Sequence, residues 1–264
     1  MSKPLAPEDL ARIADRLERA ERQGAAIPKV TDDYPGLGLS EAYAVQSELR
    51  RRRVAAGERV VGWKAGLTSK AKMVQMGVNV PGIGFLTSAM ACPENSAVST
   101  QRLIHPRVEC EVAFMMRDTL RGRDCTREEV LAATAFVFPA LEIIDSRFAG
   151  FKFDLHSVMA DNASSARFVG GGRARRVHDL DLRSLGVVME KNGRIVATAS
   201  AAAVMGHPAD AVALLVAVLA DMDEELPGGS IVLSGGITEA IPVAAGDSMV
   251  ARFQELGSVS VHFE

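Results

Sequence analysis

The chain has 264 residues, of which 48% are apolar, and a formal net charge of −3. This composition is typical of a globular protein with one large or two small domains, and it excludes a disordered chain. Because 33 acidic side chains outnumber 30 basic ones, no cationic surplus exists to bind a phosphate backbone, and we expect no nucleic-acid partner. The longest apolar runs, such as 211–220, are too short to cross a bilayer, so we expect no membrane partner.

The three cysteines, Cys92, Cys110 and Cys125, have neither the even count of a disulfide framework nor the spacing of a zinc site. Unpaired thiols of this kind are typical of a reducing compartment. The first residues become charged at once and form no apolar secretory stretch. We therefore expect a cytoplasmic protein.

The first part of the chain has helical patterns. Apolar residues recur at helical spacing in Pro7–Gln23, and Gly24 is a suitable helix end. A turn-rich stretch follows over 28–38, and Ser40 then has the character of an N-cap for a second helix that continues to Ala56. These patterns predict an N-terminal helical portion over residues 1–58, which we expect to be continuous with the remaining residues 59–264.

The rest of the chain is dominated by short strand patterns separated by turns. We expect a short helix over 68–76, a helix from Thr126 to Ala135 and a helix over 208–226. The expected strands are 59–65, 107–117, 137–145, 185–190, 194–199, 230–234, 248–254 and 258–263, with a hairpin turn at 191–193. Many strands combined with few helices predict an α+β body.

Three carboxylates lie within predicted strands. Glu109 and Glu111 are two residues apart, so in a strand they share one face, where their charges repel unless a cation lies between them. Glu142 is flanked by apolar residues in another strand, and an unpaired buried carboxylate is costly. If the three converge, they make an all-oxygen site suited to Mg²⁺ or Mn²⁺, whereas zinc would call for histidine or cysteine. The alternative is that Glu109 and Glu111 form the solvent face of an antiparallel strand.

A lysine lies within an apolar strand that ends in glycine. Lys64 precedes Gly66 and the predicted helix start at Thr68 or Ser69, where free main-chain N–H groups could receive a carboxylate. The lysine is therefore a candidate acid, base or anion-binding group. The alternative is a side chain that extends from the sheet edge into solvent.

Two small polar segments are candidates for ligand contacts. One is 159–165 followed by Arg167 and three glycines at 170–172, and the other is 234–238, which ends at Thr238. The second lacks the Lys-Ser/Thr ending of a phosphate-binding loop. Both are also compatible with turns that satisfy their own hydrogen bonds. No Gly-x-Ser-x-Gly elbow is present, so a hydrolase triad is not expected.

Four of these segments, taken in order, resemble one family. The chain is similar to the 2-keto-4-pentenoate hydratase and 4-oxalocrotonate decarboxylase group of the fumarylacetoacetate hydrolase-like superfamily. The similarity extends from about Pro7 to the C-terminus and is carried by 62–69 (GWKAGLTS), 104–111 (IHPRVECE), 141–147 (LEIIDSR) and 160–164 (ADNAS).

The resemblance implies an α+β fold with a mixed β-sandwich or roll, an N-terminal helical portion and a fumarylacetoacetate hydrolase-like catalytic domain over 59–264. It also implies Mg²⁺, or Mn²⁺, held by Glu109, Glu111 and Glu142, because these residues match the metal ligands of the family. Lys64 matches the active-site lysine of the family. A cation at this site would act as a Lewis acid toward a 2-oxo acid.

Within the group, two details favour decarboxylation. Residues 151–155 and 164–168 are similar to those of the decarboxylases, and Gly82 stands where related hydratases commonly have an acid. The implied reaction converts 4-oxalocrotonate, a 2-oxo dicarboxylic acid, to 2-hydroxypenta-2,4-dienoate and CO₂ in the meta-cleavage degradation of aromatic compounds. The alternatives are hydration of 2-hydroxypenta-2,4-dienoate and a silent subunit that accompanies such a hydratase. A complex with the hydratase and a homo-oligomer are the expected protein partners.

The same resemblance suggests roles for further residues. Main-chain N–H groups from Leu67 to Ser69 would orient the 2-oxo acid end, together with Lys64. Lys72, one helical turn beyond Thr68, would meet the departing carboxylate. The hydroxyl groups of Ser165 and Thr238 are candidates for hydrogen bonds to the substrate.

Overall fold

The computed structural model describes residues 5–68 and 82–264. Its helices are α1 (Pro7–Gln23), α2 (Val30–Asp33), α3 (Leu39–Ala55), α5 (Arg127–Ala133), α6 (Leu155–Ala160) and α7 (Pro208–Asp221), with 3₁₀ turns η1 (Ala149–Phe151), η2 (Asn162–Ser164), η3 (Val177–Asp179) and η4 (Ala201–Ala203). Its strands are β1 (Val60–Gly66), β2 (Gly82–Thr87), β3 (Ala91–Cys92), β4 (Ala97–Val98), β5 (Arg107–Met116), β6 (Thr134–Ile144), β7 (Ser165–Gly170), β8 (Gly186–Lys191), β9 (Arg194–Ser200), β10 (Ile231–Leu233), β11 (Ile241–Pro242), β12 (Ser248–Phe253) and β13 (Gly257–Phe263).

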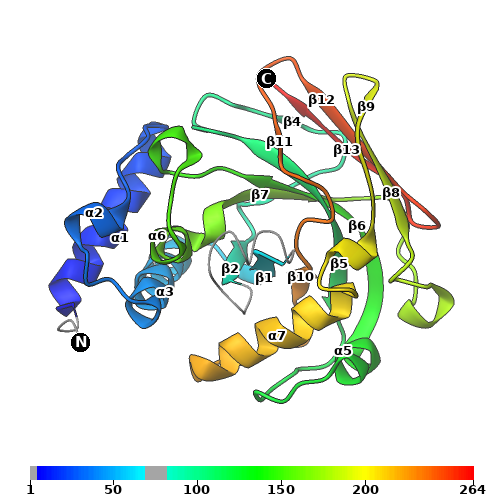
Figure 1. The fold of residues 1–264 in the computed structure, drawn as a ribbon, viewed down its shortest axis with the longest axis horizontal. Helices are drawn as coiled ribbons and strands as arrows, with labels where there is room; N and C mark the ends of the chain where they lie inside the picture. Colours follow the sequence, from blue (N-terminus) through cyan, green and yellow to red (C-terminus); the bar gives the residue numbers. More distant parts are fainter. Residues whose placement is uncertain (1–4, 69–81) are drawn as a thin grey trace.

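Two sheets form the body of the described structure. The larger sheet has eight strands in the order β2-β1-β10-β5-β6-β7-β3, with β11 added beside β5, and the smaller has five strands in the order β4-β13-β12-β8-β9. The long strands β5 and β6 of the larger sheet extend toward the smaller sheet (Figure 1). Helices α1, α2, α3 and α6 lie together on the side of the molecule away from the smaller sheet. This confirms the expected α+β architecture with mixed sheets and a helical N-terminal portion.

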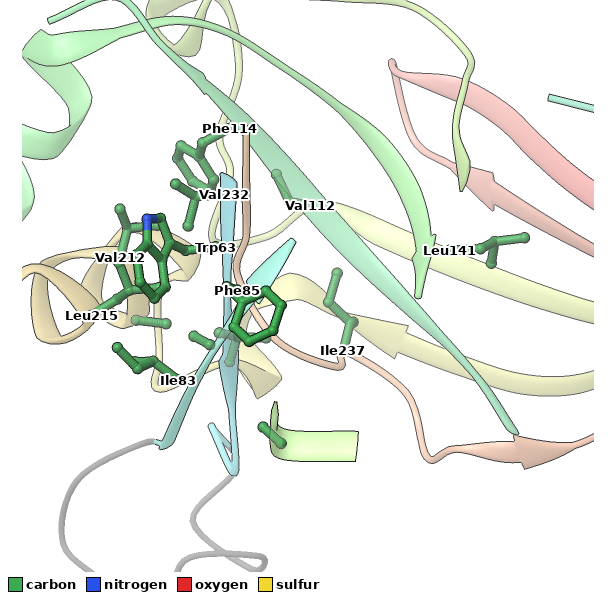
Figure 2. Packing of buried hydrophobic residues seen from close by; sticks show 14 of the residues in the cluster. Trp63, Ile83, Phe85, Val112, Phe114, Leu141, Val212, Leu215, Val232 and Ile237 are labelled. Atoms are coloured by element: carbon green, nitrogen blue, oxygen red, sulfur yellow. The ribbon is translucent and has the colours of Figure 1, made fainter. Parts of the chain in front are cut away.

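The core forms where α7 crosses the larger sheet. Val212 and Leu215 of α7 lie against Trp63 of β1, and Phe85 and Phe114 lie close by (Figure 2). Burying apolar side chains of this size stabilises the fold by about 1.5–3 kcal/mol each. The segment Ala201–Asp221 is long and apolar enough to span a membrane, but 50% of its apolar window is buried inside the protein, which is typical of a core helix.

Local signals account for several helix boundaries. Gly24 ends α1 in the left-handed conformation with φ 59°, and Thr126 begins α5 with a capping box in which Glu129 takes part. The His207 side chain caps α7 by accepting the main-chain N–H of Ala209. The expected helices over 7–23, 40–56 and 126–135 are thus confirmed within one or two residues, except that the second is capped by Gly38 rather than Ser40.

Two expectations were wrong. The helix predicted over 208–226 ends at Asp221, because Met222 closes it and Asp223 adopts a positive φ of 57°. Residues 165–170, predicted as part of a polar loop, form strand β7, which pairs with β6. The alternation of polar and apolar residues there covers only 165–168, and pairing with the long strand β6 fixes a six-residue strand. The helix predicted over 68–76 lies almost entirely outside the described residues.

Candidate metal centre

Three carboxylates converge on one face of the larger sheet. Glu109 of β5 lies directly opposite Glu142 of β6, and Glu111 is two residues further along β5. One oxygen of each residue lies within 4.8 Å of the others, and the exposed fractions of the residues are 4% for Glu109 and 0% for Glu111 and Glu142. The convergence expected from the sequence is therefore present. The alternative of a solvent face is wrong for Glu109 and Glu111.

The strand pattern explains why acids lie at this depth. Val108, Cys110 and Val112 alternate with the two glutamates on β5, and all three are fully buried in the core on the other face. Because side chains of a strand alternate, burying this apolar row forces the glutamates onto the opposite face. Pairing of β5 with β6 then brings Glu142 beside them.

Glu111 and Glu142 have carboxylate oxygens without a hydrogen-bond partner in the described part of the chain. Glu111 accepts a hydrogen bond from the main-chain N–H of Gly235 through Oε2, at 2.6 Å. Its Oε1 and the Oε1 of Glu142 have no hydrogen-bond partner among the described residues. Burial, and next to it the charge of Glu142, hold the pKa of Glu111 well above its usual value. Buried oxygens that repel one another and lack donors suit a hard divalent cation, so the donor set fits Mg²⁺ or Mn²⁺.

Lys64 lies beside the acids rather than at a sheet edge. It is 3% exposed on β1, between β2 and β10, and its Nζ lies 3.0 Å from Oε2 of Glu142. Burial by itself would lower the pKa of Lys64, but the charges of the three carboxylates, Glu142 foremost, outweigh it, so the pKa is raised. The side chain is therefore a buried ammonium group, and the alternative of a lysine extended into solvent is wrong.

A segment with strained backbone angles also contacts the Lys64 side chain. Lys64 Nζ donates a hydrogen bond to the carbonyl of Ala163 at 3.2 Å. The three consecutive residues Asn162, Ala163 and Ser164 adopt positive φ angles of 50°, 50° and 59°. Such a run is costly for residues other than glycine and persists only where surrounding contacts fix it. The contacts include two hydrogen bonds between the Asn162 amide and the main chain of Phe85, at 2.8 and 3.0 Å.

The buried ion pair of Arg147 and Asp161 anchors the start of this segment. The Arg147 guanidinium donates to the carboxylate of Asp161 and, at 2.6 Å, to its carbonyl, and both side chains are almost fully buried. A further bond runs from the Arg147 main-chain N–H to the same carboxylate at 3.2 Å. The pair fixes the chain directly before Asn162.

The other candidate residues have different surroundings. Ser165 is 1% exposed and its hydroxyl has no hydrogen-bond partner among the described residues. The Thr238 hydroxyl accepts from the Cys110 N–H at 3.3 Å and lies 3.6 Å from the Met189 sulfur, so it is already engaged in the core. Leu67 has a positive φ of 59° directly after β1. Ser69 and Lys72 lie outside the described residues.

Sequence reasoning missed how the glycine pair at 235–236 contributes. A Cβ on Gly236 would lie 2.8 Å from the carboxyl carbon of Glu109, and one on Gly235 would lie 2.1 Å from Oγ1 of Thr68. The main chain can pass this close to Glu109 and Thr68 only because both positions lack a side chain. The two glycines were visible as a turn, but nothing in the sequence indicated that the turn lies against β5.

The chain is similar to known proteins over its whole length. A family model described as fumarylacetoacetate (FAA) hydrolase C-terminal matches residues 60–264. A 4-oxalocrotonate decarboxylase of Pseudomonas sp. (strain CF600) is 51% identical over 100% of both chains, and a 2-oxo-hept-4-ene-1,7-dioate hydratase of Escherichia coli is 38% identical over 95% of this chain and 96% of the relative. The solved structure of 4-oxalocrotonate decarboxylase from Pseudomonas putida G7, complexed with magnesium and adipate, has 47% identity and a TM-score of 0.98 over 100% of both chains.

Proposed function

The chain belongs to the fumarylacetoacetate hydrolase family, and from that premise we propose that it is a metal-dependent decarboxylase of the meta-cleavage degradation of aromatic compounds. It converts 4-oxalocrotonate (2-oxohex-3-enedioate) to 2-hydroxypenta-2,4-dienoate and CO₂. The observation that carries the proposal is the buried cluster of three glutamates beside Lys64, in a chain that is 51% identical to a decarboxylase from end to end.

In this proposal, Glu109, Glu111 and Glu142 hold Mg²⁺, for which Mn²⁺ can substitute. The free oxygens of Glu111 and Glu142 support it, as does the absence of histidine and cysteine from the cluster in the described part of the chain. When bound, such an ion supplies Lewis acidity to the 2-oxo acid end of the substrate.

Lys64 acts where negative charge develops. As the bond between C5 and C6 breaks, its electron pair moves through the conjugated chain to the 2-oxo oxygen, and C6 leaves as CO₂. The enolate oxygen then takes one proton from solvent to give the 2-hydroxy product. The ammonium group of Lys64, fixed by Glu142 and the Ala163 carbonyl, is positioned to stabilise that oxygen. One such group typically contributes a factor of about 10²–10³ to the rate.

The remaining assignments belong to the same proposal. The Leu67 and Ser69 main chain and the Ser165 hydroxyl, which has no partner among the described residues, orient the 2-oxo acid. Lys72, proposed from the resemblance alone, is one candidate for meeting the departing carboxylate. Thr238 is the weakest member, because its hydroxyl already has core partners. We further propose that the enzyme works in the cytoplasm, where its three free thiols remain reduced, as a homo-oligomer and in complex with the hydratase that consumes its product.

Hydration of 2-hydroxypenta-2,4-dienoate is the second candidate, because a hydratase shares 38% identity with the chain. Gly82 argues against it. A Cβ at this position would lie 2.3 Å from the sulfur at the flexible end of Met159, so the acid that related hydratases commonly have there would require this side chain to move. Among the described residues, the acids that converge at the site are the three assigned to the cation, so position 82 supplies no further acid to activate water.

A product assay tests the proposal. We expect the purified protein with Mg²⁺ to release CO₂ from 4-oxalocrotonate, and to form no 4-hydroxy-2-oxopentanoate from 2-hydroxypenta-2,4-dienoate. The Glu142→Gln variant should lose kcat/KM by about a hundredfold or more, because it removes a charge from the cation site. The matched variant Glu190→Gln, whose carboxylate pairs with the exposed Arg252 on the smaller sheet, should stay within about twofold of the original. Hydration without CO₂ release would reject the decarboxylase assignment.

A further inference from the structure

A cation lies on the same face of β5 as the acidic cluster. Arg107 is two residues before Glu109, and it lies opposite Ile144 as Glu109 lies opposite Glu142. The pairing is regular between these positions, so Arg107 and Glu109 share one face of the sheet. Alternate residues of a strand are about 6.6–6.8 Å apart. The two carboxyl carbons of an extended six-carbon dicarboxylic acid are separated by a similar length.

The Arg107 guanidinium is held in place without an acidic partner. Its Cζ lies 4.2 Å from the centre of the Phe151 ring. Among the described residues its side chain forms no ion pair and no hydrogen bond, whereas the buried Arg147 has both. Stacking on an aromatic ring occupies the face of a guanidinium and leaves the N–H donors along its edge free. Arg107 is thus oriented and available for a planar anion.

Phe151 is itself fixed by its surroundings. It has a positive φ of 57° and its ring lies 5.4 Å from the Phe153 ring. The ring of His105 meets the Phe151 ring edge-on with centres 6.4 Å apart, and the Nε2 atom of His105 is buried with no hydrogen-bond partner among the described residues. Buried polar atoms rarely stay unpaired. The Arg107 guanidinium and the His105 Nε2 atom, both beside Phe151, therefore lack a hydrogen-bond partner among the described residues.

We propose that Arg107, whose guanidinium lies over the Phe151 ring, binds the distal carboxylate of the substrate. This contact makes the enzyme selective for 2-oxo dicarboxylic acids over 2-oxo monocarboxylic acids. The inference rests on the proposed function, since it assigns the second end of the same substrate. A guanidinium edge can bind a carboxylate through two parallel hydrogen bonds. Because the carboxylate keeps much of its charge until the bond to C5 has broken, the ion pair contributes similarly to binding of the substrate and of the transition state, so its loss raises KM and changes kcat little.

The affinities of two unreactive ligands measure the contribution of the distal carboxylate to binding. 2-Oxoadipate and 2-oxohexanoate have the same six-carbon chain and the same 2-oxo acid end, and only the first has a distal carboxylate. We expect the Mg²⁺-loaded protein to bind 2-oxoadipate about ten- to a hundredfold more tightly by titration calorimetry. Arg107→Met should abolish that preference and leave the affinity for 2-oxohexanoate unchanged. With 4-oxalocrotonate, the same variant should raise KM about tenfold or more while kcat changes less than about threefold.

Two further variants make the result specific. Phe151→Leu removes the ring but keeps Arg107, and should weaken 2-oxoadipate binding alone. Lys152→Met removes the exposed neighbouring cation and should change neither affinity. Equal binding of the two ligands by the original protein would overturn the proposal, and so would an Arg107→Met variant that binds both ligands more weakly by the same factor. The proposed function fails separately, if the original protein releases no CO₂ from 4-oxalocrotonate.

Discussion

Glu111 and Lys64 show how neighbouring charges shift the pKa of single residues in this site. The carboxyl of Glu111 is buried next to Glu142, which holds its pKa well above the usual value, while the same acids keep Lys64 charged. Glu111 therefore favours its protonated form when no cation is present. A carboxylate must lose its proton to bind a metal ion.

It follows that Mg²⁺ binding should release protons and strengthen as pH rises. The raised pKa of Glu111 means that this group holds more protons in the folded, metal-free protein than in the unfolded chain, so its contribution to stability falls as pH rises through that pKa. Calorimetric titration of Mg²⁺ in buffers of different ionisation enthalpy would count the protons released, and affinities at pH 6 and pH 8 would give the trend. The Glu111→Gln variant should release fewer protons. Identical affinity at both pH values with no proton release would contradict this picture.

The single residues of the site could be predicted only in part from the sequence. Glu109 and Glu111 were visible because their alternation with Val108, Cys110 and Val112 fixes which face they share. The Ala163 carbonyl and the Gly235 N–H, which hold Lys64 and Glu111, are main-chain groups. No side-chain pattern reports where a main-chain group points, so these contacts needed the three-dimensional structure.

At the scale of elements, the turn between α6 and β7 positions the site by combining strain with a buried ion pair. Asp161 ends α6 and bonds to Arg147, and the left-handed residues Asn162–Ser164 follow directly. The sequence marked this stretch as polar, but a run of asparagine, alanine and serine does not predict three positive φ angles. Strand β7 was missed because its alternation over 165–168 is too short to distinguish a strand from the polar loop before it, and its pairing with β6 is visible only in the structure.

Removing the anchor of this turn should destabilise the protein strongly. In the Arg147→Met variant, the buried carboxylate of Asp161 loses its guanidinium partner, and breaking such a pair typically costs about 3–5 kcal/mol. The matched variant Arg252→Met loses an exposed ion pair with Glu190, for which we expect at most about 1 kcal/mol. Urea unfolding of the two variants measures both effects. Equal midpoints for the two would mean that Arg147 does not hold the turn.

At the scale of the whole molecule, the N-terminal helices are joined to the sheets by buried polar contacts as well as by the core. The Gln46 amide of α3 is 1% exposed and donates to the carbonyls of Ile83 on β2 and Met159 on α6, at 2.9 and 2.8 Å. Ile13 and Leu17 of α1 belong to the same apolar cluster as Trp63 of β1. These contacts cross the boundary at residue 58 that the sequence patterns indicated.

Residues 1–58 and 59–264 should therefore unfold together. Circular dichroism, which reports helix content, and the fluorescence of the single tryptophan, Trp63 on β1, should give the same urea midpoint, as expected for one cooperative unit. A chain restricted to 59–264 should fail to fold, because the carbonyls of Ile83 and Met159 would lose the Gln46 amide and the apolar cluster would lose its helical side. A helical transition well below that of Trp63, or a cooperatively folded 59–264 fragment, would instead make the N-terminal helices a separate domain.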